Sequence, residues 1–371
     1  MSIGRRWKGL VGATGLAVVL ALAFGGGDGH AQSLPTTQPY LWSTPVNLDL
    51  INSEHSEDLP HISRDGNSLY FISDRPRNGS TTDFDIYVSH RQGGVWGLPK
   101  RLGRNINTSF NERGPCLSPD GHYLFFSSDR QVPGAFGSQD LYVSYREDTS
   151  NDFGWEVPYN LGDAVNTANP DYGAALIGNL DGTLSSLLFG RRVDGHNHIY
   201  MSGYFYGYLQ QAAPVTELNH SDSNDWRPTV RADGLQLFFH SDRPESMGYD
   251  IWVSTRPDLS SLWSPPSRVG APINTDSDEQ FPAVSADGSM LIFSSNRPGS
   301  IGSDTSDLWV STRRPIIHYW PRAPSPPETE RLQGARSRAV PAPRPSSSLA
   351  PRGRRGSRWP PVPPRPPSAA S

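Results

Sequence analysis

The sequence predicts an all-β protein, a five-bladed β-propeller closed by its own N-terminal strand. Three observations lead to this fold. A group of four motifs recurs about every 55 residues, and Asp-Gly turns stand between short aromatic and β-branched runs. The tryptophan-containing segment that the last repeat lacks is found before the first repeat. No stretch shows a sustained period of about 3.6 residues, so helices are not expected. Six blades is the alternative, if the long third repeat hides another unit.

The repeated phrase has four parts, which in the first copy cover residues 60–66, 69–75, 85–89 and 96–103. Further copies surround the Asp-Gly pairs 120–121, 233–234 and 287–288, and a worn third copy keeps Asp181-Gly182 and residues 198–202. Asp-Gly between two apolar runs favours a hairpin, because glycine accepts positive φ without steric cost. Each phrase therefore predicts a four-stranded antiparallel sheet. Such a sheet has two apolar faces, which radial packing against like sheets would cover.

The N-terminal segment that begins at Trp42 is predicted to complete the last blade. The fifth copy ends near Ser311 without its Trp-x-x-Pro part, whereas Trp42-Ser-Thr-Pro45 and the following Ile51-Asn52 match the segments that begin at Trp96, Trp155 and Trp263. Closure of the ring would remove exposed sheet edges. We therefore expect the propeller to span residues 40–315.

The two ends of the sequence differ from the repeats. Residues 1–31 combine a basic start, an apolar run from Leu10 to Phe24 and small residues before Gln32, which predicts a secretory signal peptide and export to the periplasm or the extracellular space. Residues 316–371 are rich in proline, arginine and serine, with too few apolar residues to offset the entropy of ordering, and predict a disordered tail. Twin-arginine and general secretory export both remain open.

Charge and cysteine usage limit the classes of function. The overall formal charge of −4 includes about +2 from the predicted signal peptide and +8 from the tail, so the repeats hold about −14. This acidic balance, together with export, disfavours nucleic-acid binding. The single cysteine, Cys116, excludes an internal disulfide and is expected to be buried and inert. No transmembrane segment and no oligomer are expected.

One acidic residue stands at the same place in every copy, three residues before the proline of the inner strand or its equivalent Ala174. The set is Glu57, Glu112, Asp171, Asp225 and Glu279. If the inner strands line a central channel, these carboxylates could form a ring near one mouth. Two interpretations stay open: each carboxylate accepts backbone N–H groups from a loop, or the ring binds a cation, with oxygen ligands favouring Ca²⁺.

The next position along is chemically mixed, as a binding mouth requires. It is occupied by Asp58, Arg113, Tyr172, Trp226 and Gln280. The aromatic residues could stack on a sugar or grip a peptide, and Arg113 could pair with a carboxylate. Loops on a rigid scaffold are the usual place for binding, so these five residues are predicted to contact a partner.

The other repeated charges are predicted to be structural, because a residue present in every blade serves what every blade needs. We expect the arginines that follow the second strand, such as Arg75 and Arg297, to pair with the aspartates that open the third strand of the same blade, such as Asp85 and Asp307. No nucleophile elbow, zinc-protease motif or phosphate-binding loop is present, and no catalytic residue is predicted.

The phrases Pro-x-x-Ser-x-Asp-Gly, Leu-x-Phe-x-Ser-Asp-Arg-Pro, Asp-Ile-Trp-Val-Ser and Trp-x-x-Pro-x-x-Leu-Gly together resemble the TolB-type, WD-like β-propeller repeat family over most of residues 42–313. The resemblance implies an exported bacterial scaffold that binds a protein or peptide in the cell envelope at one face of the disc, without a required cofactor. The alternative is an extracytoplasmic carbohydrate-active enzyme or sugar-binding propeller. A hydrolase would need a deep pocket with two carboxylates about 5–10 Å apart, and a scaffold a flatter mouth.

Overall fold

The computed structural model describes residues 40–76, 83–178, 184–205, 208–302 and 305–315. The predicted signal peptide (1–31), the tail (316–371) and the Asp181-Gly182 turn lie outside these residues. Regular structure in the described ranges is entirely β, without a helix. A membrane-spanning helix is accordingly absent from this part of the chain.

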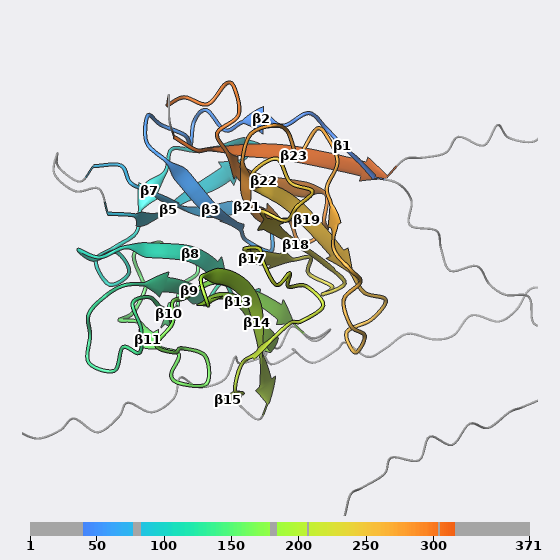
Figure 1. The fold of residues 1–371 in the computed structure, drawn as a ribbon. Coiled ribbons are helices and arrows are strands. Elements are labelled where there is room, and N and C mark those ends of the chain that lie inside the picture. The colour runs from blue at the N-terminus through green and yellow to red at the C-terminus, as the bar shows by residue number, and fades with distance from the viewer. Residues whose placement is uncertain (1–39, 77–82, 179–183, 206–207, 303–304, 316–371) are drawn as a thin grey trace, which may run out of the picture. The chain divides into compact units, whose positions relative to one another are not determined.

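The strands form five antiparallel sheets, which we call blades 1 to 5 in chain order of their inner strands (Figure 1). Blade 1 contains β3 (Glu57–Ile62), β4 (Ser68–Ser73), β5 (Asp85–Gln92), β6 (Val95–Trp96) and β7 (Lys100–Arg101). Blade 2 contains β8 (Glu112–Leu117), β9 (Tyr123–Ser128), β10 (Asp140–Tyr145) and β11 (Tyr159–Asn160). Blade 3 contains β12 (Asp171–Gly178), β13 (Leu184–Val193), β14 (His196–Phe205), β15 (Tyr208–Leu209) and β16 (Ala213–Pro214).

Blade 4 contains β17 (Asp225–Val230), β18 (Gln236–Ser241), β19 (Asp250–Thr255) and β20 (Ser267–Arg268). Blade 5 contains β21 (Glu279–Val284), β22 (Met290–Ser295) and β23 (Asp307–Pro315), joined by β1 (Tyr40–Trp42) and β2 (Val46–Asn47). The inner strands contact one another in a closed circle, β3–β8–β12–β17–β21 and back to β3. The propeller has five blades, so the six-bladed alternative is wrong.

The predicted closure by the N-terminal segment is confirmed. In blade 5, Val46 pairs with Val310 and Trp42 with Arg313 on the far side of β23 (Figure 1). Trp42 also reaches the neighbouring blade, where its ring meets Phe238 edge to face at 6.2 Å. The two ends of the repeat region are therefore fastened both by strand pairing and by packing.

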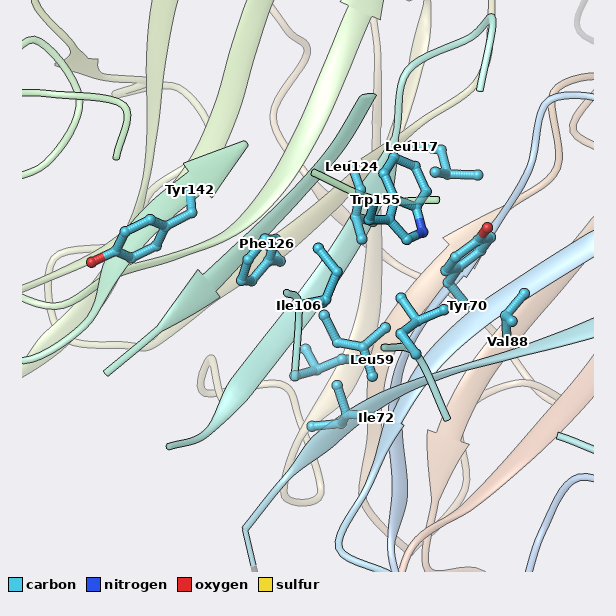
Figure 2. Close-up of a cluster of buried hydrophobic side chains, with 12 residues drawn as sticks. Leu59, Tyr70, Ile72, Val88, Ile106, Leu117, Leu124, Phe126, Tyr142 and Trp155 are labelled. Carbon is cyan, nitrogen blue, oxygen red and sulfur yellow. The ribbon is translucent and has the colours of Figure 1, made fainter. Parts of the chain in front are cut away.

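The core lies between blades, because each sheet buries both of its faces. Figure 2 shows one such cluster, in which Tyr70 and Ile72 of blade 1 meet Leu124 and Phe126 of blade 2, and Trp155 from the blade 2 loop covers the group. Each fully buried side chain of this size contributes roughly 1.5–3 kcal/mol. Phe126 and Tyr70 have no exposed surface, so a sheet that lost its neighbour would expose much of this apolar area.

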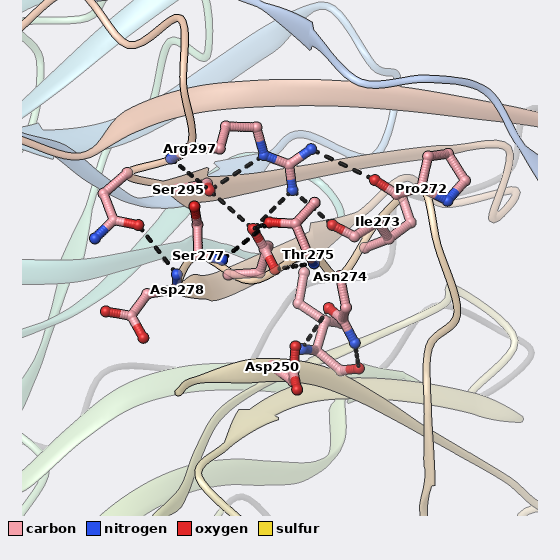
Figure 3. A network of polar contacts seen from close by, with 12 residues as sticks. Asp250, Pro272, Ile273, Asn274, Thr275, Ser277, Asp278, Ser295 and Arg297 are labelled. Carbon is pink, nitrogen blue, oxygen red and sulfur yellow. Dashed lines mark hydrogen bonds and ion pairs between the residues drawn. The ribbon is translucent and has the colours of Figure 1, made fainter. Parts of the chain in front are cut away.

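In every blade one arginine pairs with the acid of the inner strand, which is not the predicted partner. Arg297 donates to the backbone oxygen of Ile273 (Figure 3). It also donates to Glu279 at 2.9 Å, and its guanidinium lies 4.9 Å from the ring of Phe293. The same arginine-to-acid pairing recurs in the other blades, as Arg75–Glu57, Arg130–Glu112, Arg191–Asp171 and Arg243–Asp225. The expected pairing with the aspartate of the third strand is wrong.

The aspartates that open the third strands have partners of their own. Asp250 pairs with Arg268 of the outer strand at 2.6 Å, and Asp307 accepts a hydrogen bond from Asn47 of the closing strand at 2.6 Å. Since Asp250 lies on the side of the blade away from the channel, the arginine that follows the second strand reaches the inner-strand acid first. Aspartates at this position thus fix the outer edge of four of the five sheets.

The inner strands bulge at one common position, which shapes the channel. In β3 the pairing with β4 shifts between Asp58 and His61, and the other four inner strands shift at the matching point. The bulge residue has positive φ in every blade: Leu59 at 53°, Gly114 at 60°, Gly173 at 71°, Arg227 at 55° and Phe281 at 51°. Non-glycine residues in this conformation are uncommon and cost on the order of 1 kcal/mol each, and they gather at functional sites.

Candidate functional site

A cavity of about 540 Å³ opens at the end of the channel where the inner strands begin. We call it the mouth pocket. Its floor is the ring of five bulge residues described above, all of which line it. Because the bulges break the regular pairing of the inner strands, they turn these backbones toward the channel and close it from below.

Arg227 is the centre of the floor. Its guanidinium donates to the backbone oxygens of Pro60 at 3.3 Å, Pro115 at 3.0 Å and Ala174 at 3.2 Å, one from each of blades 1 to 3. The residue is 3% exposed and, among the described residues, has no carboxylate partner. Burial lowers the pKa of Arg227 to about 10, so it remains charged at neutral pH.

The position of Arg227 requires small neighbours in two blades. A Cβ atom on Gly173 would lie 3.2 Å from Cδ of Arg227, and one on Gly114 would lie 3.2 Å from the backbone of Gly173. Both glycines also adopt positive φ. Glycine at these two bulges therefore allows the long side chain from blade 4 to cross the channel.

One side of the pocket is aromatic. Tyr172, Trp226, Tyr249 and Phe281, which we call the aromatic wall, come from blades 3 to 5. The ring of Trp226 lies 4.9 Å from Tyr172 and 5.6 Å from Phe281, both edge to face, and His240 supports it from behind at 5.1 Å. The interlocked rings hold one another in place and leave Trp226 partly exposed to the pocket.

The pocket also has polar lining residues, most of them from blades 2 and 3. Arg113 stacks on the ring of Phe84 at 4.2 Å, and Asp129 accepts two hydrogen bonds from Asn111, both at 2.8 Å. Burial lowers the pKa of Arg113, whereas the carboxylates of Asp129, Asp58 and Asp74 act in the opposite direction. Amide groups of Gln139, Asn197 and Asn224 also line the pocket.

Of the five residues predicted to contact a partner, Arg113, Tyr172 and Trp226 line the mouth pocket together. Asp58 and Gln280 do not line it. Asp58 accepts a hydrogen bond from Ser306 at 2.6 Å, and burial raises its pKa to about 6. The structure thus brings three of the five side chains into one cavity and leaves two beside it.

The acidic set serves the blades and does not face the channel. Glu57, the first member, has no exposed surface; it accepts hydrogen bonds from the backbone and hydroxyl of Ser53, both at 2.7 Å, and pairs with Arg75. The other acids, Glu112, Asp171, Asp225 and Glu279, likewise accept a loop N–H group. Successive side chains of a strand point to opposite sides, which separates the acids from the mouth residues.

The interpretation of the acidic set as acceptors of loop N–H groups is therefore confirmed. A cation-binding ring, and with it the possible Ca²⁺ site, is not formed by these carboxylates. No group of three or more acidic, histidine or cysteine side chains in the described residues is arranged to hold a metal ion.

Two pocket residues escaped the sequence analysis although the repeats mark them. Arg192 occupies the position held by Asp74, Asp129 and Asp242 in three other blades. Arg227 occupies the bulge position, where the neighbouring blades 2 and 3 have glycine. At both positions the residue type departs from the one found in other repeats, and this departure was the available signal. A search of the repeats for shared residues does not detect it.

A second cavity, of about 90 Å³, lies below the floor and is lined by His61 and Cys116 among others. Arg227 is the one residue that lines both cavities, so its guanidinium separates them. Cys116 is 3% exposed, and burial raises the pKa of its thiol to about 12. The expectation of a buried cysteine is confirmed, and the raised pKa keeps the thiol protonated at neutral pH.

Comparison with known proteins bears on the fold alone. No protein-family model matches the sequence, and neither does any curated protein. Among solved structures, a TolB candidate from Agrobacterium tumefaciens is 18% identical, with 72% of this chain and 82% of that one covered and a TM-score of 0.43. A thermostable family-43 glycoside hydrolase is 14% identical (71% and 90% covered, TM-score 0.47), and an endo-arabinase from Bacteroides thetaiotaomicron VPI-5482 is 14% identical (69% and 94% covered, TM-score 0.48). Membership of the TolB-type repeat family stays a prediction.

Proposed function

We propose that this protein is an exported, saccharide-binding propeller that holds its ligand in the mouth pocket. The observation that supports this most directly is that the aromatic wall shares one cavity of about 540 Å³ with amide and guanidinium groups. Sugars offer apolar C–H faces to aromatic rings and hydroxyl groups to amides, so a pocket that contains both kinds of group suits them. Export rests on the first 31 residues, which lie outside the described structure.

The pocket favours binding over hydrolysis. Cleavage of a glycoside requires two carboxyl groups across the scissile bond. Asp129 is the one carboxylate among the residues that line the pocket, and both of its oxygens accept hydrogen bonds from Asn111. Asp58, whose raised pKa would suit an acid, does not line the cavity. No pair of opposed carboxyl groups therefore lines the pocket.

The protein or peptide partner favoured by the sequence is less well supported. A scaffold of that kind was expected to present a flatter mouth, whereas the bulge residues and the aromatic wall enclose a concave cavity. A peptide end could still enter such a cavity. The binding assay described below therefore includes peptides.

The proposal is tested by isothermal titration of the mature chain with a panel of neutral and acidic oligosaccharides and of short peptides. Trp226→Ala should weaken binding at least tenfold, about 1.4 kcal/mol, because it removes the centre of the aromatic wall. Trp226→Phe should retain part of the affinity. The control is Tyr208→Ala, which removes an aromatic ring that is 69% exposed on blade 3, outside the pocket.

Thermal unfolding of each variant separates lost binding from lost folding. If the folded Trp226→Ala variant binds saccharide as well as the unchanged protein does, the aromatic wall is not the ligand site. If no saccharide of the panel binds the unchanged protein, the proposed function is wrong.

A further inference from the structure

The charges that line the mouth pocket are unevenly compensated. Three guanidinium groups, from Arg113, Arg192 and Arg227, line it together with the single carboxylate of Asp129. Arg113 faces carboxylates on its own side, Asp129 and Asp58 among them. The positive charge of blade 2 is thus offset locally. The guanidinium groups of Arg192 in blade 3 and Arg227 in blade 4 lack such compensation among the described residues.

Arg192 reverses a charge that three of the other blades keep. At this position Asp74, Asp129 and Asp242 each accept a hydrogen bond from the backbone N–H of a loop residue. In blade 3 the loop residue that precedes the inner strand is Pro170, which has no backbone N–H group, so no side-chain acceptor is needed there. The side chain is exposed, and the described residues provide it with no ion-pair partner.

The connection that follows Arg192 is also exceptional. Blade 3 joins its second and third strands by the tight turn Asp194-Gly195, both residues with positive φ, whereas blade 2 uses residues 129–139 for the same connection. Gly195 lines the pocket beside Arg192. A short turn of this kind leaves the guanidinium at the pocket edge without a covering loop.

Arg227 supplies the second uncompensated charge. It is 3% exposed, its guanidinium is held by carbonyl oxygens, and its Nε atom has no hydrogen-bond partner. The indole Nε1 of Trp226, the adjacent pocket residue, is likewise buried without a partner. Buried polar atoms in native proteins normally have partners, and exceptions call for an explanation. Here both orphan donors belong to residues that line the same pocket.

We propose that the ligand carries a carboxylate, and specifically that the mouth pocket binds a uronic-acid saccharide whose carboxylate pairs with Arg192 in the field of Arg227. This inference rests on the proposed saccharide-binding function and deepens it. The sugar ring would lie against Trp226 and Tyr172, which are next to Arg192 in the lining. A planar guanidinium can hold a carboxylate through two parallel hydrogen bonds, which a neutral sugar cannot offer.

The test is isothermal titration of the mature chain with galacturonate, glucuronate and mannuronate oligosaccharides, each compared with its neutral methyl ester. The acid form should bind at least tenfold more tightly than the ester, and added salt should reduce this preference. Arg192→Gln should abolish the difference between acid and ester. Arg64→Gln should keep it, because Arg64 is an exposed arginine that lines the small cavity on the other side of Arg227.

Each outcome has one meaning. Equal binding of acids and esters to the unchanged protein would overturn the carboxylate inference and leave the saccharide proposal standing. Loss of the preference in Arg64→Gln as well as in Arg192→Gln would also overturn it, since the effect would then come from net charge. Binding of none of the saccharides would overturn both proposals, and so would binding of an acidic peptide such as triglutamate in their place.

Discussion

Two histidines join neighbouring blades in their neutral form, and one of them gives a measurable dependence of stability on pH. Nε2 of His61 in blade 1 accepts a hydrogen bond from the backbone N–H of Leu117 in blade 2 at 3.0 Å. Burial and, second, the charge of Arg227 lower the pKa of His61 to about 3. An acceptor nitrogen carries no proton, so protonation would break this bond between blades.

The sign follows from proton uptake in the two states. In the unfolded chain His61 titrates near pH 6.5, whereas in the fold it stays neutral down to about pH 3. The unfolded state therefore binds more protons between these values, and the contribution of His61 is complete above pH 6.5 and declines as the pH falls. Between pH 7 and pH 5 the contribution of His61 to the free energy of unfolding falls by about 2 kcal/mol, at 1.36 kcal/mol per pKa unit. This is an upper value, because the ring of His61 is partly exposed.

The perturbation is His61→Gln, which can accept the N–H group of Leu117 through Oε1 but does not titrate. We expect the free energy of unfolding of the unchanged protein to fall by about 2 kcal/mol more than that of the variant between pH 7 and pH 5. Urea unfolding followed by tryptophan fluorescence at the two pH values measures this difference.

His55→Gln is the control for the removal of a histidine as such, because the side chain of His55 is 41% exposed. His240 accepts a hydrogen bond from the backbone N–H of Phe281, and burial also lowers its pKa. It is present in all three proteins, so its contribution cancels when their stabilities are compared. If the unchanged protein and His61→Gln lose the same stability between pH 7 and pH 5, the ring of His61 is not held neutral and the reasoning is refuted.

Two further substitutions test the frame of the propeller. Glu279→Ala would leave the buried guanidinium of Arg297 without its counter-charge, which should destabilise the fold by about 3–5 kcal/mol, and Glu279→Gln should destabilise it less. Denaturant unfolding of the two variants measures both losses. A loss of under about 1 kcal/mol for Glu279→Ala would show that the pair is solvated. Trp42→Ala removes a contact between the closing strand and blade 4, so we expect a loss of about 2–4 kcal/mol and faster cleavage of residues 40–47 by protease. Unchanged proteolysis would mean that strand pairing alone holds the ring closed.

The repeated residues proved to be structural, as expected, but with different partners. Four of the five repeats carry the equivalents of Arg75 and Asp85, yet the sequence cannot show which charges meet. In the fold, the inner-strand acid Glu57 lies nearer to Arg75 than Asp85 does, because Asp85 turns to the outer strand and pairs with Arg101. Sequence spacing does not predict which acid pairs with Arg75, since the strands that carry Glu57 and Asp85 are both adjacent to the strand that precedes the arginine.

The sequence by itself determined the five blades, the closure by the segment around Trp42 and the burial of Cys116, because these follow from periodicity and from the turns that glycine permits. Only the tertiary structure decided which side chains share the mouth pocket. Arg227 and Arg192 reach it because each inner strand bulges and because blade 3 has a short turn, and both features depend on backbone geometry. A pocket of this kind is assembled from residues more than a hundred positions apart, such as Arg113 and Trp226, and their proximity is a property of the closed ring.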